Sequence, residues 1–253
     1  MAHPLRNPPN WVTLAGLACG CMAILQVCTP GPIEPAQLAH AAVLILFAGI
    51  FDMVDGRFAR LVGRESELGV QLDSLADLIG FGVAPAVLAY AWKLHLLGSW
   101  GMFVAVAFAA CAALRLARFN VEGSGEGWPY HGHSRGLTST MAGGSLAILV
   151  WVCNDLLLDQ VFLSSFALCG IMSVLSFLMI SAVPFRNFRD ARSNRNARGL
   201  LAVFLAMTLG GMVVIEPAVG WGIGALLYII LGGLEGLSIR LREVVGGARR
   251  RSP

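Results

Sequence analysis

The chain has 253 residues, of which 57% are hydrophobic and only 13% are charged, and its formal net charge is +3. This composition excludes an ordinary soluble domain and predicts a polytopic membrane protein, with a lipid bilayer around it and no nucleic-acid partner. The first hydrophobic stretch follows a short polar start without a cleavage signal, so we expect it to remain in the protein.

Apolar runs long enough, or nearly long enough, to cross a bilayer predict an all-α bundle of about eight transmembrane helices. In chain order these runs cover residues 11–28, 36–61, 67–92, 98–121, 137–155, 160–183, 199–215 and 217–237. We expect a single membrane domain over residues 1–253, with a catalytic core at about 8–190, an additional C-terminal hairpin at 199–237 and a basic tail at 238–253. The last two runs are separated so briefly that a re-entrant pair is the alternative there.

The basic residues are distributed very unevenly between the two ends of these runs. All 17 arginines fall on one side of the predicted bundle, and the single lysine, Lys93, falls on the other. Cytoplasmic ends of membrane helices are enriched in Lys and Arg, so both termini are predicted to be cytoplasmic, which requires an even number of spans. We therefore expect an integral protein of the cytoplasmic membrane of a prokaryote.

Four aspartates interrupt the second and third apolar runs. Asp52 and Asp55 are three residues apart on the second run, and Asp73 and Asp77 are four apart on the third, so each pair lies on one helical face. The short link between the runs makes them a hairpin, which can turn the two pairs toward each other near the cytoplasmic interface. Ionisable groups inside hydrophobic helices are costly, and this arrangement indicates a functional site.

Four adjacent carboxylates repel one another unless a strong positive charge joins them. Oxygen-only ligands suit a divalent ion such as Mg²⁺, Mn²⁺ or Ca²⁺. Gly56 and Ala59 leave room beside the acids, and Arg60 has the geometry to hold a phosphate. The pattern favours phosphoryl-type transfer from a diphosphate whose remaining part is lipid. The alternatives are acids that only join helices by hydrogen bonds, and an acid-lined cation transporter.

The block D-x2-D-G-x2-A-R-x8-G-x3-D-x3-D resembles the signature of the CDP-alcohol phosphotransferase family at every defined position. The resemblance implies two bound Mg²⁺ or Mn²⁺ ions and a homodimer. It implies metal ligation by Asp52, Asp55, Asp73 and Asp77, and catalysis by Asp77 as general base. It also implies a group of residues that border the CDP-lipid, namely Gly56, Ala59, Arg60 and Gly69, with Asn10 and Thr13 from a P-N-x-x-T segment.

Segments outside the signature resemble the branch of that family that transfers the phosphatidyl group of CDP-diacylglycerol to L-serine. They lie at residues 72–86, 113–120 and 178–185. This likeness implies that Arg115, Arg118 and Asn120 bind the acceptor, with Arg186 a fainter candidate. The branch usually reads G-L-P where this chain has Gly136-Leu137-Thr138. Another acceptor therefore stays open, such as glycerol phosphate, inositol phosphate or choline.

Overall fold

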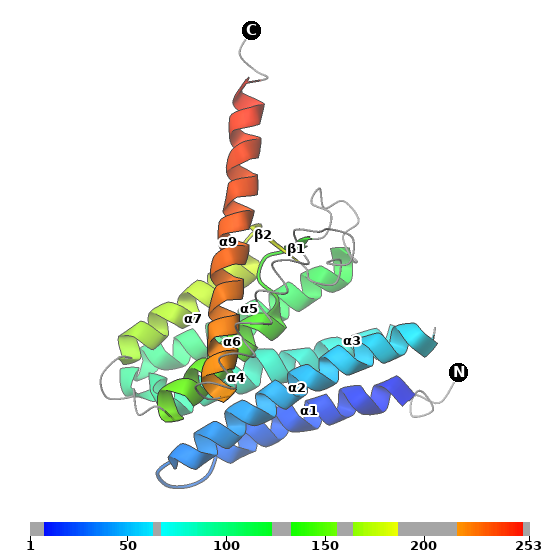
Figure 1. The fold of residues 1–253 in the computed structure, drawn as a ribbon. Coiled ribbons are helices and arrows are strands. Elements are labelled where there is room, and N and C mark those ends of the chain that lie inside the picture. The colour runs from blue at the N-terminus through cyan, green and yellow to red at the C-terminus, as the bar shows by residue number, and fades with distance from the viewer. Residues whose placement is uncertain (1–7, 63–66, 123–132, 156–163, 187–216, 250–253) are drawn as a thin grey trace.

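The computed structural model describes residues 8–62, 67–122, 133–155, 164–186 and 217–249, and it is a bundle of helices with one small β-ribbon (Figure 1). The helices are α1 (Pro8–Val27), α2 (Pro35–Val62), α3 (Glu67–Asp77), α4 (Ala84–Trp92), α5 (Ser99–Glu122), α6 (Ser139–Asp155), α7 (Ser165–Ile180) and α9 (Pro217–Arg249). The strands are β1 (His133–Arg135) and β2 (Pro184–Arg186).

The helices begin near the positions that the apolar runs predict, but one run is divided, and α9 continues to Arg249, beyond the predicted run at 217–237. The predicted helix at 67–92 consists of α3, a π-helical segment at Leu78–Val83, and α4. The predicted run at 199–215 lies outside the described residues. Within the residues that the structure describes, four helical stretches are long and apolar enough to cross a membrane by length and composition, at Asn10–Val27, Pro35–Gly56, Glu67–Trp92 and Ser99–Val121. The helical membrane architecture is therefore confirmed to this extent.

The π-helical segment lies where three helices approach one another closely. A Cβ added to Gly20 of α1 would lie 3.0 Å from the Cα of Gly80, and one added to Gly143 of α6 would lie 2.3 Å from the carbonyl oxygen of Phe81. Small residues allow such backbone contact between helices in a membrane protein. A larger residue at either glycine would push α1 or α6 away, so these glycines determine how the segment after Asp77 is held.

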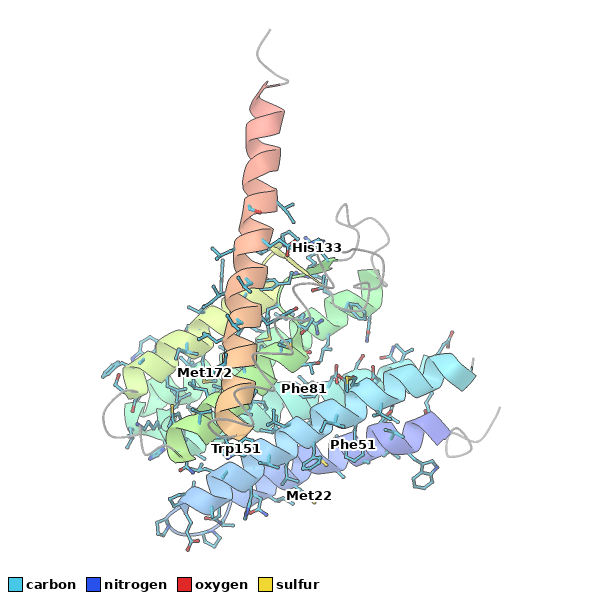
Figure 2. The ribbon with its side chains drawn as sticks, in the orientation of Figure 1. Met22, Phe51, Phe81, His133, Trp151 and Met172 are labelled. Carbon is cyan, nitrogen blue, oxygen red and sulfur yellow. The ribbon has the colours of Figure 1, made fainter. Side chains whose placement is uncertain are left out.

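The hydrophobic core is shared by α1, α2, α4, α5, α6 and α7. Phe108, Leu146 and Met172 are fully buried there, and each comes from a different helix. Figure 2 shows Phe81 and Met172 inside the bundle, with Phe51 on α2. The aspartate-bearing helix α2 belongs to this core through Ile45 and Ala48, so the carboxylates extend from a packed element.

The β-ribbon and α9 cover the end of the bundle where α7 finishes. β1 and β2 pair antiparallel, with Ser134 opposite Phe185. α9 packs on β2, where Gly232 leaves room for the Phe185 ring. His133 lies at the ribbon beside α9, and its Nε2 is 3.8 Å from a carboxylate oxygen of Glu235 (Figure 2). Strands of three residues are too short to be predicted from the sequence. The last helix, α9, crosses the other helices steeply (Figure 1).

Candidate functional site

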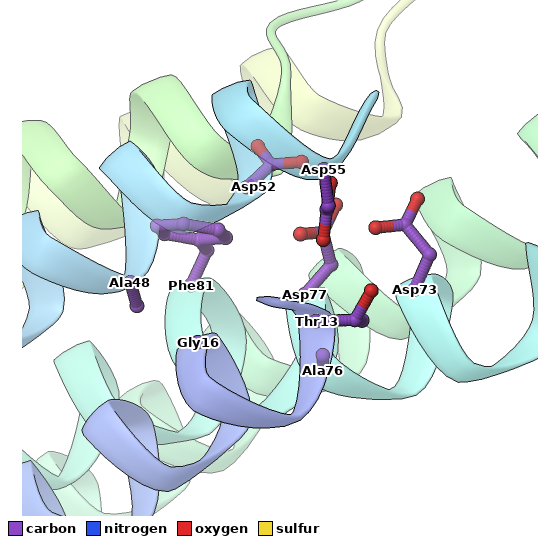
Figure 3. Close-up of a pocket in the computed structure, with 9 residues that line it drawn as sticks. All are labelled: Thr13, Gly16, Ala48, Asp52, Asp55, Asp73, Ala76, Asp77 and Phe81. Atoms are coloured by element: carbon purple, nitrogen blue, oxygen red, sulfur yellow. The ribbon is translucent and has the colours of Figure 1, made fainter. Parts of the chain in front are cut away.

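The four aspartates meet in one pocket, as their helical spacing predicts. Asp52 and Asp55 reach it from α2, and Asp73 and Asp77 reach it from α3 (Figure 3). The pocket is lined by Thr13, Gly16, Ala48, Asp52, Asp55, Asp73, Ala76, Asp77 and Phe81. The prediction that two carboxylate pairs turn toward each other is confirmed.

Three of the carboxylates form a compact set of oxygen ligands. One oxygen each from Asp52, Asp55 and Asp73 lies within 4.8 Å of the others. Asp55 is only 5% exposed, so water does little to screen the repulsion between these acids. Carboxylates at this separation suit a hard divalent cation, and the donor set fits Mg²⁺ or Mn²⁺.

Asp77 lies in the same pocket but outside that three-ligand set. Its carboxylate is repelled by the charges of Asp52, Asp73 and Asp55 and attracted by that of Arg115. It is the last residue of α3, directly before the π-helical segment. Local π-helical turns often occur at functional sites, because they rotate the residues next to them relative to a regular α-helix.

The first helix supplies a side chain to the pocket from the side opposite α2 (Figure 3). Thr13 is buried, lines the pocket, and donates a hydrogen bond to the Asp55 carboxylate. Asn10 lies one turn earlier on α1 and is also buried. Of the two residues predicted from the P-N-x-x-T segment, Thr13 lines the pocket and Asn10 is not among the lining residues, and their contact with the CDP-lipid stays a prediction.

The glycines of the signature lie near the aspartates, and the structure leaves space at one of them. Gly56 follows Asp55 on α2, and a Cβ added to it would contact nothing within 4 Å. Gly69 lies on α3, one turn before Asp73. Ala59 and Arg60 belong to the last turns of α2, and their side chains lie outside the described part of the structure, as does the side chain of Arg186.

Arg115 is the predicted acceptor residue that the structure joins to the aspartates. Its guanidinium interacts electrostatically with Asp77 and Asp52, and its Nη1 donates to the Ser139 Oγ at 2.8 Å. Arg118 instead donates to the Ile180 carbonyl oxygen at 3.0 Å, at the end of α7. The two arginines thus contact different elements.

Asn120, the third predicted acceptor residue, joins α5 to α3. Its Nδ2 donates to the Ser74 Oγ at 2.9 Å, and Ser74 is the residue after Asp73. This contact holds the end of α5 beside the aspartate-bearing helix.

Several residues at the site have no signal in the sequence. Ser139 and Thr140 begin α6, and the Thr140 hydroxyl donates to the Asp52 Oδ2 at 3.4 Å. Tyr228 of α9 is buried, lies 6.4 Å from the Phe185 ring centroid, and interacts electrostatically with Arg115. A serine, threonine or tyrosine in an apolar helix is common, so only the tertiary contacts identify these three.

Comparison with known proteins gives one family. The CDP-alcohol phosphatidyltransferase family model matches residues 6–231. A CDP-diacylglycerol–serine O-phosphatidyltransferase of Bacillus subtilis is 36% identical over 182 residues, which cover 72% of this chain and 90% of that protein. The enzyme of the same name from Helicobacter pylori is 31% identical over 253 residues, 96% of each chain. The one from Saccharomyces cerevisiae is 44% identical over 88 residues, 35% of this chain and 31% of that protein.

Proposed function

This chain belongs to the CDP-alcohol phosphatidyltransferase family, and we propose that it transfers the phosphatidyl group of CDP-diacylglycerol to the hydroxyl of L-serine, giving phosphatidylserine and CMP. The observation that carries the proposal is the pocket in which Asp52, Asp55, Asp73 and Asp77 meet beside Arg115. The similarity over nearly the whole chain to a relative named CDP-diacylglycerol–serine O-phosphatidyltransferase supports serine as the acceptor.

The carboxylates are proposed to hold two divalent ions, Mg²⁺ or Mn²⁺. In support, Asp52, Asp55 and Asp73 place ligand oxygens within 4.8 Å of one another, close enough to share one ion, and Asp77 borders the same pocket. When bound, such ions neutralise the diphosphate and stabilise charge that develops on the leaving group. The open space beside Gly56 suits the CDP group, and Asn10, Thr13, Ala59, Arg60 and Gly69 are proposed to border it.

Asp77 is proposed to act as the general base. It accepts the proton of the serine hydroxyl, whose oxygen forms a bond to the phosphorus on the lipid side, and the bond from that phosphorus to the CMP oxygen breaks. The nearby charge of Arg115 suits the serine carboxylate, which needs a cation for recognition. Arg118 and Asn120 support this end of the pocket through their contacts with Ile180 and Ser74.

An assay with purified full-length protein tests the function. The protein is incubated with CDP-diacylglycerol, Mg²⁺ or Mn²⁺, and labelled serine, glycerol phosphate, inositol phosphate or choline in separate reactions. We expect CMP release and labelled lipid only in the reaction that contains serine. Product with a different alcohol would overturn the acceptor, and metal flux into vesicles without CMP release would favour a cation transporter.

We propose eight spans, with both termini and the aspartate pocket on the cytoplasmic side. The arginine distribution supports this topology. The count of eight includes α9, which crosses the other helices steeply (Figure 1), and the predicted run at 199–215. Single cysteines at residues 3 and 252, in a background without native cysteines, should react with a membrane-impermeant thiol reagent only after the membrane is opened. Labelling of either one in intact cells would overturn the topology.

The single-domain organisation over residues 1–253 and a homodimer are also proposed, because members of the family that this chain resembles are expected to share them. Multi-angle light scattering of the detergent-purified protein measures the protein mass within the micelle. A mass of twice 26.8 kDa is the expected value, and a mass of one chain would overturn the dimer.

A further inference from the structure

Two neighbouring hydroxyl groups at the start of α6 reach the two halves of the site. Ser139 is fully buried and accepts a hydrogen bond of 2.8 Å from Arg115 of α5. Thr140 donates one of 3.4 Å to Asp52 of α2. Consecutive residues on a helix point about 100° apart. The first turn of α6 can therefore contact Arg115 through Ser139 and Asp52 through Thr140 at the same time.

This turn of helix is itself fixed at its N-terminal side. Thr138 caps it, because its hydroxyl accepts from the Met141 N–H at 3.3 Å and its carbonyl oxygen accepts from the Ala142 N–H at 3.0 Å. Just before the cap, the Gly136 N–H donates to the Val183 carbonyl oxygen at 2.9 Å and the Leu137 N–H donates to the Leu178 carbonyl oxygen at 3.0 Å. The end of α7 thus holds the residues that lead into α6.

We propose that Ser139 and Thr140 are positioning residues that hold Arg115 and Asp52 at a fixed separation. The acceptor that Arg115 binds is thereby held at a fixed distance from the metal that Asp52 ligates. The inference deepens the proposed function and rests on it for the serine half. A donor on one carboxylate oxygen of Asp52 limits rotation of that group and orients its oxygens toward the other ligands. An acceptor for one Arg115 N–H leaves the rest of the guanidinium for an anionic group in the pocket.

The metal half is tested by Mn²⁺ binding, without any turnover. Full-length protein in detergent is titrated with Mn²⁺, and the free ion is measured by electron paramagnetic resonance. Thr140→Val keeps the shape of the side chain but loses the hydroxyl, and we expect affinity to fall about tenfold, as for other residues that orient metal ligands. Thr140→Ser should bind as wild type does. This role would be overturned if Thr140→Val bound Mn²⁺ as tightly as wild type, or if Thr140→Ser lost as much Mn²⁺ affinity as Thr140→Val.

A control from the same helix separates position from general damage. Ser145 lies on α6, and its hydroxyl donates to the Met141 carbonyl oxygen at 2.6 Å within the helix. Ser145→Ala should leave Mn²⁺ affinity and serine kinetics unchanged. A loss as large as that of Thr140→Val would mean that any lost hydroxyl on α6 has the effect, and would overturn the proposal. Thr140→Ala gives a second test if Thr140→Val is poorly folded.

The acceptor half is tested by the KM for serine. Ser139→Ala should raise that KM about tenfold, because Arg115 loses the partner that orients it, while the KM for CDP-diacylglycerol and Mn²⁺ affinity stay near wild type. Equal increases in both KM values would overturn the role of Ser139. If wild type released no CMP with serine, the proposed function would fail, and the Mn²⁺ titrations would still decide the role of Thr140.

Discussion

The proposed metal-binding and acceptor-binding regions of the pocket are built in different ways. All four aspartates come from residues 52–77, on two helices that follow one another in the chain. The proposed acceptor region combines one residue from each of four elements. These are Arg115 of α5, Ser139 at the start of α6, Ile180 at the end of α7 and Tyr228 of α9. The aspartate cluster is thus determined by two helices that are adjacent in the chain, whereas the proposed acceptor region depends on how distant helices pack.

This difference predicts two kinds of mutational effect. Changes among the aspartates should reduce turnover or metal binding and leave the fold intact, because loss of a charge relieves repulsion among the acids and offsets lost hydrogen bonds such as that from Thr13 to Asp55. Changes in the acceptor region should alter serine recognition or stability, since the same residues join helices. The variants below test that separation.

The largest effect is expected at Asp77. Asp77→Asn removes the proposed base, and turnover should fall by about 10²–10⁴ while the protein still binds CDP-diacylglycerol. Steady-state CMP release measures the first quantity, and calorimetric titration with the lipid in detergent measures the second. Turnover at the wild-type rate would show that another group removes the serine proton.

Arg115 and Arg118 provide a matched pair on one helix. Arg115→Gln should raise the serine KM about 10–100-fold, the effect of losing one or two charge-assisted contacts. Arg118→Gln should change it much less, because Arg118 donates to the Ile180 carbonyl oxygen and joins α5 to α7. The comparison is made from serine saturation curves at a fixed CDP-diacylglycerol concentration. Equal increases for the two variants would remove the special role of Arg115.

The aspartate region was predictable because its pattern is contained within single helices. Asp52 and Asp55, and then Asp73 and Asp77, share a face through spacings of three and four residues, which requires no knowledge of packing. Their convergence followed from the short link between the two runs. The metal-binding part of the pocket was therefore visible in the sequence.

The acceptor region was only partly predictable, because its contacts join residues far apart in the chain. The Thr140 to Asp52 hydrogen bond spans 88 positions, and the Arg115 to Ser139 bond spans 24. The π-helical segment also has no local signal, since it depends on the close approach of Gly20 to Gly80. The changed loop at Gly136 to Thr138 did mark this region, but its meaning required the packed structure.

Gly136 tests whether the acceptor region is also a structural joint. Its φ is +75°, and an added Cβ would lie 2.7 Å from the Met179 carbonyl oxygen. Gly136→Ala should therefore reduce the free energy of unfolding by about 1–3 kcal/mol. Gly144→Ala is the matched control, because Gly144 lies inside α6 with nothing within 4 Å of an added Cβ. Urea or thermal unfolding in detergent compares the two, and an equal loss in both would contradict this explanation.

The smallest expected effect is at Thr138, which caps α6 with its hydroxyl. Thr138→Ala should lower stability by about 1 kcal/mol, and Thr138→Asp should retain most of it because a carboxylate also accepts from the Met141 N–H. Since the cap holds the turn that carries Ser139 and Thr140, Thr138→Ala should also raise the serine KM modestly. Unfolding midpoints and serine saturation curves measure both quantities. A stability loss without any change in serine KM would mean that the acceptor region tolerates movement of the α6 N-terminus, and would limit its dependence on packing to the direct contacts of Arg115.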